Sequence, residues 1–370
     1  MPTHHPENER IKRQYFVFLK EAKQQAEDSV DAAAEAIARF ETDTHHRDFK
    51  AFHFELAVAF KRRLSERDSQ TTGGKLSKAT QYATLSHLKR FFQWLAQAPG
   101  YKSKLRYSDA EFFNLSQKDT RVATARRERP VPTLEQIKHT IASMPAGGDI
   151  EQRNRALLAF ALLTGARDGA LATFKLKHVN LAAGSVYQDA RDVKTKFSKS
   201  FTTTFFPVGA DVRQIVDDWV NHLRRDLLWG NDDPLFPATR IALGAAQHFE
   251  AVGIDRKAWT TASPIRAIFK QAFEAAGLPY FHPHSLRSTL VQLSYTLCQT
   301  PEEVKAWSQN LGHEGVLTTF YSYGTVAPGR QGEIIKNLSM PRPAEAGNTA
   351  AMAVTLFRLM QQEGMLATPR

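Results

Sequence analysis

Residues 116–133, SQKDTRVATARRERPVPT, constrain the fold of this 370-residue chain more than any other segment. They contain almost no large apolar side chain, carry four arginines and include two prolines. Such a composition is typical of a linker. The segments on either side of it are each long enough to bury a hydrophobic core. The sequence therefore predicts two domains joined by a basic connector, with a tail left over.

Net charge narrows the class of partner. The chain carries a formal charge of +11, and its pI is near 9.6. A field of this sign attracts polyanions, so nucleic acid is the expected partner, with a merely basic protein as the alternative. The lone Cys298 excludes an intramolecular disulfide and offers no cysteine cluster for zinc, which fits a reducing cytoplasm. A polar N-terminus and the short apolar run at 156–163 predict a soluble, unsecreted protein.

Amphipathic helices are predicted over the first third of the chain. Residues 9–40 alternate charged and alanine-rich turns, and residues 48–64 repeat apolar side chains at a spacing of four. After the polar segment 71–74, Ser77 can cap a third helix, which Pro99-Gly100 ends. Basic side chains on these helices predict a phosphate-contacting face, with an ordinary solvated surface as the alternative: Lys61, Arg62, Lys75, Lys78, His87, Lys89 and Arg90.

The connector itself adds Arg126, Arg127 and Arg129 to the candidate contacts. An extended basic segment can lie along a duplex and neutralise phosphates, although an ordinary solvated connector is the alternative. Beyond Thr133 the pattern becomes mixed. It predicts short strands near 185–206 and, on either side, helices near 134–143, 151–164, 211–224 and from 263 onward. The expected fold is mainly α with a small antiparallel β-sheet.

Two helix ends carry candidate chemistry in the second domain. The apolar helix through Leu157 stops at Thr164-Gly165, and Arg167 follows on the corner, where a guanidinium can present its planar fork to a phosphate. Another helix opens with a capping box at 300–303 and runs to Leu311-Gly312, after which His313 follows. A surface arginine after a helix is commonplace, so neither end decides the function alone.

A hairpin is predicted over 192–208, because apolar and threonine residues alternate on its second strand. Its turn holds Lys194, Lys196 and Lys199. An ammonium on a flexible stem can reach a bound phosphodiester and give a proton to a leaving alkoxide. A solvated turn is the alternative interpretation.

The segment HPHSLRSTLVQLSYTL predicts a helix in which His284 and Arg287, three residues apart, share a face. The buried stripe is expected on a different face, formed by Leu286, Leu290, Leu293 and Leu297. His282 precedes the helix and is expected to cap it or pack. No carboxylate accompanies the histidines at a useful spacing, so no metal site is predicted.

Two tyrosines follow His313 at eight and ten residues, Tyr321 and Tyr323. On a helix their side chains would project about 200 degrees apart, so that only one can face a site. Either could be a nucleophile, and packing in a core is the alternative for each.

The chain resembles the tyrosine recombinases, or phage-type integrases, because five features occur in that family's order: TGAR, the lysine hairpin, HSLR, LGH and a downstream tyrosine. The ordered set is more specific than any member of it. The resemblance implies a two-domain DNA clamp, with a helical core-binding domain and a mixed α/β catalytic domain. The implied boundaries are an N-terminal helical extension at 1–44, a core-binding domain at 45–115, a basic linker at 116–133, a catalytic domain at 134–340 and a C-terminal tail at 341–370.

The resemblance also implies the roles of the candidate residues. In that family two arginines bind the scissile phosphate, which corresponds here to Arg167 and Arg287. His284 matches the general base, and His313 matches the last phosphate-contacting position. Lys194 matches the acid for the leaving 5′ oxygen, with Lys196 as the fallback.

Two positions depart from the family pattern. The common nucleophile lies nine residues after the LGH histidine, where this chain has Ser322. We favour Tyr323, because LTTF-x-SYG resembles a subgroup with longer spacing, and Tyr321 is the fallback. Where many relatives place an acidic residue three after the first arginine, this chain has Ala170, and Asp168 could substitute.

The implied function is a site-specific recombinase or integrase that cleaves and rejoins DNA through a 3′-phosphotyrosine, without a metal, ATP or any other cofactor. The implied partner is double-stranded DNA, on which four copies of the chain would hold paired sites as a homotetramer. Without DNA, the protein could be a monomer. A cytoplasmic, nucleoid-associated protein encoded by a bacterium or phage is expected. The alternatives are a DNA-relaxing enzyme like type IB topoisomerases and a catalytically silent DNA-binding protein of the same fold.

Overall fold

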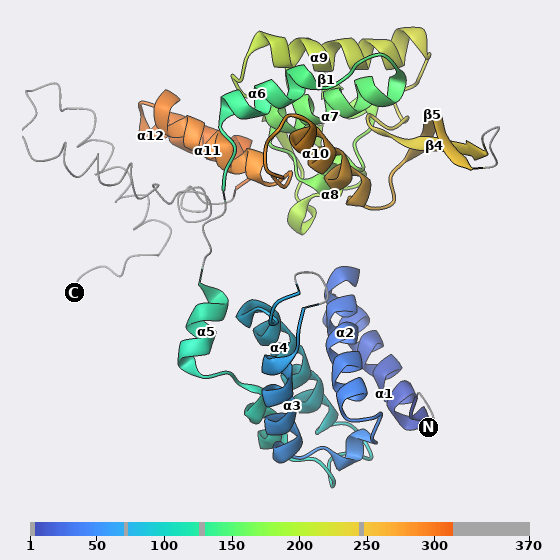
Figure 1. Cartoon of the computed structure of the whole chain (residues 1–370), viewed down its shortest axis with the longest axis vertical. Coiled ribbons are helices and arrows are strands. Elements are labelled where there is room, and N and C mark those ends of the chain that lie inside the picture. The colour runs from blue at the N-terminus through green and yellow to red at the C-terminus, as the bar shows by residue number, and fades with distance from the viewer. Residues whose placement is uncertain (1–3, 70–72, 126–129, 244–247, 314–370) are drawn as a thin grey trace, which may run out of the picture. The chain divides into compact units, whose positions relative to one another are not determined.

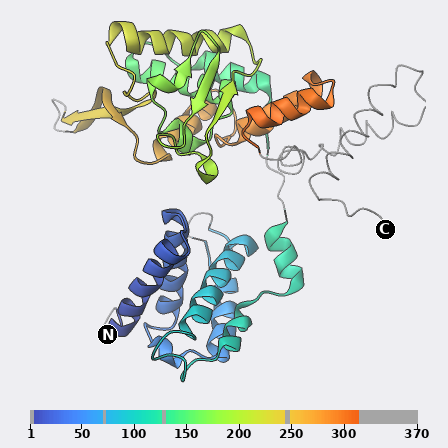
Figure 2. The same ribbon diagram turned by 180° about the vertical axis from the view of Figure 1, so that it is seen from behind.

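The computed structural model describes residues 4–69, 73–125, 130–243 and 248–313. The chain forms two compact units, Met1–Glu128 and Arg129–Arg370, each with its own hydrophobic core. The first is helical, and the second combines helices with small antiparallel sheets (Figures 1 and 2). The predicted fold class, mainly α with a small antiparallel sheet, is confirmed. In the described ranges, no helix is long and apolar enough to cross a membrane.

The described part of the first unit is built from α-helices joined by short turns. A π-helical turn, η1 (Phe18–Ala22), extends the first helix, and two 3₁₀ segments, η2 (Phe49–Ala51) and η3 (Tyr107–Phe113), connect later ones. The helices are α1 (Pro6–Val17), α2 (Glu27–Asp43), α3 (Phe54–Glu66), α4 (Lys78–Leu95) and α5 (Gln117–Thr124).

An aromatic cluster holds the first unit together. Phe52 stacks on Phe92 of α4, with the ring centroids 3.7 Å apart, and Phe40 of α2 meets Phe92 edge-on at 5.1 Å. Aromatic pairs in these geometries stabilise a core beyond the area that they bury. One continuous core runs from Ile11 to Phe113. The helices predicted as an N-terminal extension therefore pack in the same core as those of the predicted core-binding domain.

The start of α4 is as predicted, because the Ser77 hydroxyl accepts the backbone N–H of Thr80. The connector differs from the prediction, since residues 117–124 are helical where an extended segment was expected. Ser116 caps this helix by accepting the N–H of Asp119 at 3.0 Å, and Asp119 pairs with Lys78 of α4 at 3.2 Å. Local capping thus overrides the lack of apolar side chains.

The second unit contains a three-stranded sheet, a separate hairpin and seven described α-helices. The antiparallel sheet has the order β1-β2-β3, formed by Val179–Asn180, Ser185–Gln188 and Phe201–Thr204. The hairpin pairs β4 (Pro237–Leu243) with β5 (Phe249–Ala258). The helices are α6 (Leu134–Ser143), α7 (Asp149–Thr164), α8 (Asp168–Leu171), α9 (Ala210–Asn221), α10 (Ser263–Ala275), α11 (Ser285–Leu297) and α12 (Pro301–Asn310).

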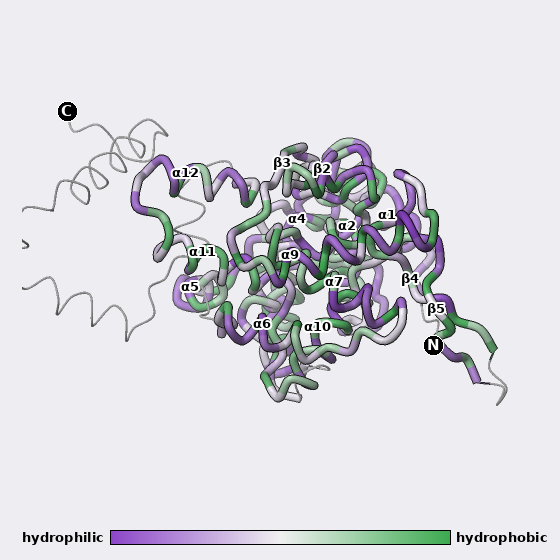
Figure 3. The backbone as a smooth tube through the Cα atoms, turned by 90° about the horizontal axis from the view of Figure 1, so that it is seen from above, coloured by the Kyte–Doolittle hydropathy of each residue, from purple (hydrophilic) through white to green (hydrophobic). Residues whose placement is uncertain are grey.

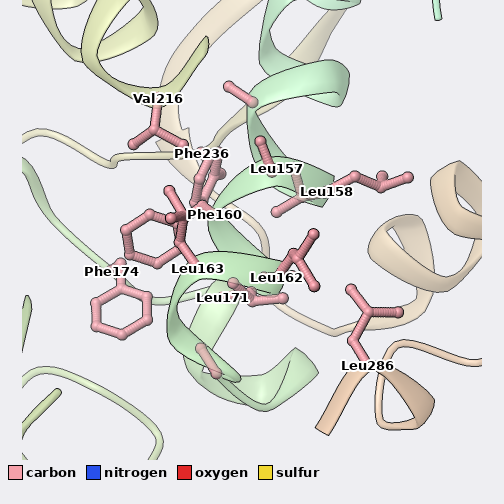
Figure 4. Close-up of a cluster of buried hydrophobic side chains, with 14 of the residues drawn as sticks. Leu157, Leu158, Phe160, Leu162, Leu163, Leu171, Phe174, Val216, Phe236 and Leu286 are labelled. Atoms are coloured by element: carbon pink, nitrogen blue, oxygen red, sulfur yellow. The ribbon is translucent and has the colours of Figure 1, made fainter. Parts of the chain in front are cut away.

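Helix α7 is the centre of the second core. Every residue from Ala156 to Thr164 is buried, so this helix is covered on all sides. Figure 4 shows its side chains among Phe174, Val216 and Phe236. Helix α9 is instead amphipathic, burying Val212, Val216, Trp219 and Val220, and its tube alternates in colour in Figure 3. Helix α7 ends where predicted, because Gly165 adopts a left-handed φ of 58°.

The hairpin β4–β5, which projects from the rest of its unit in Figure 1, was not predicted from the sequence. Its side chains show no strong alternation of buried and exposed residues, so the usual strand signal is missing. Its base is fixed by Arg153 of α7, whose guanidinium donates to the carbonyl of Pro237 at 2.9 Å and lies 5.0 Å from the ring centroid of Trp259. This long-range support is invisible in local sequence.

The predicted leucine stripe of α11 is correct only over its first half. Leu286 and Leu290 are buried, Leu293 is half-buried and Leu297 is 45% exposed. Leu297 lies beside an open groove of about 440 Å³ whose walls come from β3, the segment after it and α12. The C-terminal turn of α11 thus lies beyond the core in the described structure, which the sequence period alone cannot reveal.

Helix α12 is joined to the edge of β3. The side-chain amide of Asn310 donates to the carbonyl of Thr204 at 2.8 Å, and its oxygen accepts the Thr204 N–H at 2.7 Å. The Thr203 hydroxyl donates to the Asn310 carbonyl at 3.0 Å. Gly312 then turns with φ 71°, so close to Phe201 that an added Cβ would overlap the aromatic ring. The residue after this glycine is therefore held in place relative to the sheet.

Replacing Gly312 by alanine should cost more stability than the same change at Gly277. Both glycines have nearly the same φ, 71° and 72°, but a Cβ at Gly277 meets nothing within 4 Å. We expect a cost of about 1 kcal/mol at Gly277 from backbone conformation alone, and about 2–4 kcal/mol at Gly312, where overpacking is added. Denaturant unfolding of both variants measures the difference, and equal costs would contradict the packing argument.

Candidate active site

The guanidinium of Arg287 is the centre of the candidate site. It is only 2% exposed, and it projects from the first turn of α11. It donates to the carbonyl of Gly165, just past α7, and at 2.7 Å to the carbonyl of Leu311, just past α12. A buried guanidinium cannot lose its proton, so it requires such acceptors. Arg287 thereby binds the ends of two helices to the start of a third.

His313 completes the surroundings of Arg287. Its Nε2 lies 3.0 Å from Nη2 of Arg287, and its side chain is 6% exposed. Because a guanidinium can only donate, Nε2 must accept, and the proton of the neutral ring is on Nδ1. Burial and the charges of Arg287 and Arg167 lower the pKa of His313 to about 3. His313 is therefore neutral at physiological pH.

His284 lies at the start of α11, where its backbone N–H donates to Nδ1 of His282 at 3.2 Å, the capping role predicted for His282. The side chain of His284 is partly exposed, but the protein atoms around it desolvate the ring. This desolvation is the largest cause that lowers the pKa of His284 to about 4, and the charges of Arg287 and Arg167 are the next largest. Its imidazole is likewise neutral at physiological pH.

Arg167 is half-buried at the N-terminus of α8, two residues after Gly165. Its charge contributes to the lowered pKa of both His284 and His313, so it acts on the same space as Arg287. The position three residues later, Ala170, is 1% exposed and packs in the core. The carboxylate of Asp168 accepts a hydrogen bond from Nε of Arg266 at 2.7 Å. The negative charge of Asp168 partly opposes the lowering of the His284 pKa.

The lysines lie between β2 and β3. Lys194 is exposed, and its backbone N–H donates to the Thr173 hydroxyl at 2.9 Å. The charge of Lys196 contributes to the lowered pKa of His313, so this lysine is electrostatically coupled to the site. The predicted second strand is present as β3, but the hairpin predicted over 192–208 is wrong in its first strand: β3 pairs with β2 at 185–188, and residues 189–200, which hold the lysines, form a loop and not a tight turn.

The structure thus brings Arg167, His284, Arg287 and His313 into one electrostatic unit, with Lys196 acting on it. Tyr321 and Tyr323 lie outside the described residues, and so does the tail at 341–370. Among the residues that are described, no group of three histidine, cysteine or acidic side chains could hold a metal ion. Two permanent cations beside two neutral imidazoles suit an anion with several oxygens, such as a phosphate.

The basic residues predicted for the first unit have different surroundings. Lys61 donates to the carbonyls of Phe112 and Asn114. Ion pairs at 2.6–3.2 Å engage Lys75 with Asp68, Lys78 with Asp119 and Lys89 with Glu111. Arg62 and Arg90 are exposed on α3 and α4, and His87 is half-buried. Arg126, Arg127 and Arg129 lie outside the described residues.

Sequence reasoning missed two groups that shape this site. The hydroxyl of Thr173 accepts the backbone N–H of Lys194. Asp192, at the start of the lysine loop, forms ion pairs with Lys175 and Lys177. A threonine after a short helix carries no local signal for such a contact, which joins positions 21 residues apart.

Residues 132–329, more than half of the chain, match the family model described as the phage integrase family. A tyrosine recombinase XerC of Lactobacillus delbrueckii subsp. bulgaricus is 23% identical over 265 residues, which cover 69% of this chain and 77% of that protein. The chain belongs to the phage integrase family, the tyrosine recombinases, and is an enzyme of this type. The family predicted from the ordered motifs is therefore confirmed.

Solved structures share the fold. A lambda integrase dimer bound to a COC′ core site has a TM-score of 0.58 at 16% identity, covering 87% of this chain and 81% of that one. The XerH site-specific recombinase bound to a palindromic difH substrate has a TM-score of 0.53 at 18% identity, covering 89% and 85%. The Tn1549 transposon integrase in complex with transposon right end DNA has a TM-score of 0.54 at 14% identity, covering 89% and 99%.

The lowered pKa of His313 predicts a pH-dependent stability. The unfolded ring binds a proton below its ordinary pKa of 6.5, whereas the folded ring does so only near 3, so stability falls as the pH is lowered through this window. His313→Gln keeps an acceptor for Arg287 but does not titrate. We expect its loss of stability between pH 7 and pH 5 to be smaller than that of the wild type by about 2 kcal/mol. Unfolding curves at both pH values measure this, and parallel losses would contradict it.

Proposed function

We propose that this protein is a site-specific DNA recombinase or integrase that cleaves and rejoins strands through a 3′-phosphotyrosine, without metal or ATP. The observation that carries the proposal is the buried Arg287, held by two helix-end carbonyls beside the neutral His313. Such a cation is oriented before substrate arrives. Preorganised donors of this kind stabilise the charge that develops on a phosphate in the transition state.

The proposed cleavage exchanges one phosphodiester for another. The tyrosine oxygen attacks the scissile phosphorus, the bond from phosphorus to the 5′ oxygen breaks, and the 3′ phosphate remains on the tyrosine. Arg167 and Arg287 neutralise the nonbridging oxygens, and His313 is a further contact. A 5′ hydroxyl from another strand then attacks the phosphotyrosine and releases the enzyme. Because one phosphodiester replaces another at each step, no external energy source is required.

Proton transfer is assigned to two groups. The neutral ring of His284 can accept the tyrosine proton, and the negative charge of a bound phosphate would raise its basicity by offsetting the two arginines. Lys194 gives its proton to the leaving 5′ oxygen in this proposal. Lys196 is the fallback, supported by the effect of its charge on His313.

Double-stranded DNA is the proposed partner. The net charge of +11 favours a polyanion, and the relatives with solved structures include a lambda integrase, XerH and the Tn1549 integrase, each described with DNA. We propose that the core-binding residues 45–115 and the catalytic residues 134–340 clamp a duplex, and that four protomers join two sites. The proposed location is the cytoplasm of a bacterium, at the nucleoid.

The proposed nucleophile is Tyr323, and a suicide duplex tests it. The duplex would carry the sequence that the protein selects from a random DNA library, with a nick that lets the short fragment bearing the released 5′ hydroxyl diffuse away. Wild type and Tyr321→Phe should accumulate a covalent adduct on denaturing gels, whereas Tyr323→Phe should lose it by more than about 10³-fold, because the attacking oxygen is absent.

The remaining outcomes separate the alternatives. An adduct that persists in Tyr323→Phe and disappears in Tyr321→Phe would transfer the role to Tyr321. Gel-shift binding without any adduct in the wild type would identify a catalytically silent DNA-binding protein. Relaxation of a supercoiled plasmid lacking the selected sequence would identify a topoisomerase-like activity instead.

The tail at 341–370 carries an apolar stripe that includes Leu356 and Phe357. We propose that it docks on a neighbouring protomer. A chain truncated at Arg342 should then bind a single site normally but lose higher-order assembly on paired sites, as native gels would measure. Unchanged assembly would reject the proposal and favour docking on its own catalytic domain.

A further inference from the structure

The loop that carries Lys194 is fastened to the segment that follows Arg167. Thr173 lies just beyond α8, the short helix whose N-cap residue is Arg167. Its hydroxyl accepts the backbone N–H of Lys194 at 2.9 Å and lies 3.2 Å from the carbonyl of Gly169 within α8. The hydroxyl can accept one hydrogen bond and donate another, so it connects the lysine backbone with the helix backbone.

Close packing supports the same connection. A Cβ added to Gly169 would lie 3.8 Å from the carbonyl oxygen of Lys194 and 3.9 Å from its Cβ. Val193, the residue before the lysine, is 2% exposed and belongs to the core. The backbone at Lys194 therefore rests directly on α8, although its side chain extends into solvent.

A second anchor lies two residues before Lys194, at Asp192. Its carboxylate accepts from the ammonium of Lys175 at 2.9 Å and from that of Lys177 at 2.8 Å. Lys177 also pairs with Asp232 at 2.9 Å. The two lysines follow Thr173 by two and four residues, so the side chain of Asp192 and the backbone of Lys194 are both bound to the segment 173–177, and Val193 between them is buried in the core.

The physical consequence concerns alignment. A lysine side chain has a flexible stem, and proton transfer to a leaving oxygen needs its ammonium within hydrogen-bonding distance at the moment of cleavage. Fixing the backbone at Lys194 relative to Arg167 limits the volume that the ammonium searches. Arg167 would bind the phosphate. The ammonium of Lys194, whose backbone is bound to the segment that follows Arg167, would lie close to the leaving oxygen of that phosphate.

We propose that Thr173 is a positioning residue, whose hydroxyl keeps the lysine loop aligned with Arg167 so that the ammonium reaches the leaving 5′ oxygen, and that Asp192 is its second anchor. This inference rests on the proposed function. It assigns to Thr173 no contact with DNA and no proton transfer of its own.

The test compares two leaving groups. The first substrate is the suicide duplex described above, and the second carries sulfur in place of the 5′ bridging oxygen at the mapped scissile phosphate. A thiolate leaves without a proton, so a defect confined to proton delivery disappears on this substrate. The variants are Thr173→Val, which keeps the shape but removes the hydroxyl, and Thr173→Ser, which restores it.

We expect Thr173→Val to form adduct about 10- to 100-fold more slowly than wild type on the oxygen substrate, and within about threefold of wild type on the sulfur substrate. Thr173→Ser should be near wild type on both. Ser200→Ala is the matched control, since the Ser200 hydroxyl accepts the Ala190 N–H in the same loop at 2.9 Å, whereas the Lys194 N–H is bound by Thr173. It should slow neither reaction by more than about threefold.

Several outcomes would overturn the inference. Adduct formation by Thr173→Val that is equally slowed on both substrates would indicate a general structural role, and wild-type rates on both would indicate no role. If Thr173→Val fails to fold, Asp192→Asn replaces it and must show the same selective rescue by sulfur. A wild type that forms no adduct on either substrate would instead reject the proposed function, and the inference with it.

Discussion

Hydrogen bonds from one buried guanidinium to two helix-end carbonyls organise the second unit. Arg287 binds the peptide that follows α7 and the peptide that follows α12, and each of those helices ends in a left-handed glycine. The charge cannot be neutralised by proton loss, so the surrounding backbone must satisfy it. The corner with Arg167 and the turn with His313 are therefore parts of one arrangement, and neither can move without leaving Arg287 short of an acceptor.

The electrostatic character of the site follows from this packing. Two arginines in a confined space oppose protonation of any nearby base, and both histidines accordingly have lowered pKa values. The site combines positive charge, which can bind an anion, with the neutral ring of His284, which can accept a proton. The carboxylate of Asp168 accepts a hydrogen bond from Arg266, which limits the extent to which its charge cancels the positive field of the site.

Local signals predicted the features that depend on local chemistry. Helix ends at Gly165 and Gly312, the cap at Ser77 and the capping box at Thr300 all follow from backbone groups within one turn. Features that depend on distant residues were not predictable. The hairpin β4–β5 relies on Arg153 for support, and Thr173 acquires its role only through a residue 21 positions away. The ordered motifs identified the family, but they could not reveal which groups orient them.

Sequence separation gives the join at Arg287 a consequence for biosynthesis. The bond from Arg287 to Gly165 spans 122 residues, that from Thr203 to Asn310 spans 107, and that from Thr289 to Pro132 spans 157. Contacts of such long range form only after the intervening chain exists and has paid the entropy of loop closure. On the ribosome, α7 emerges long before α11 and α12, yet Leu286, Leu290 and Leu311 from the later segments belong to the core around it. The core and the arrangement around Arg287 are therefore completed together, by the last described helices.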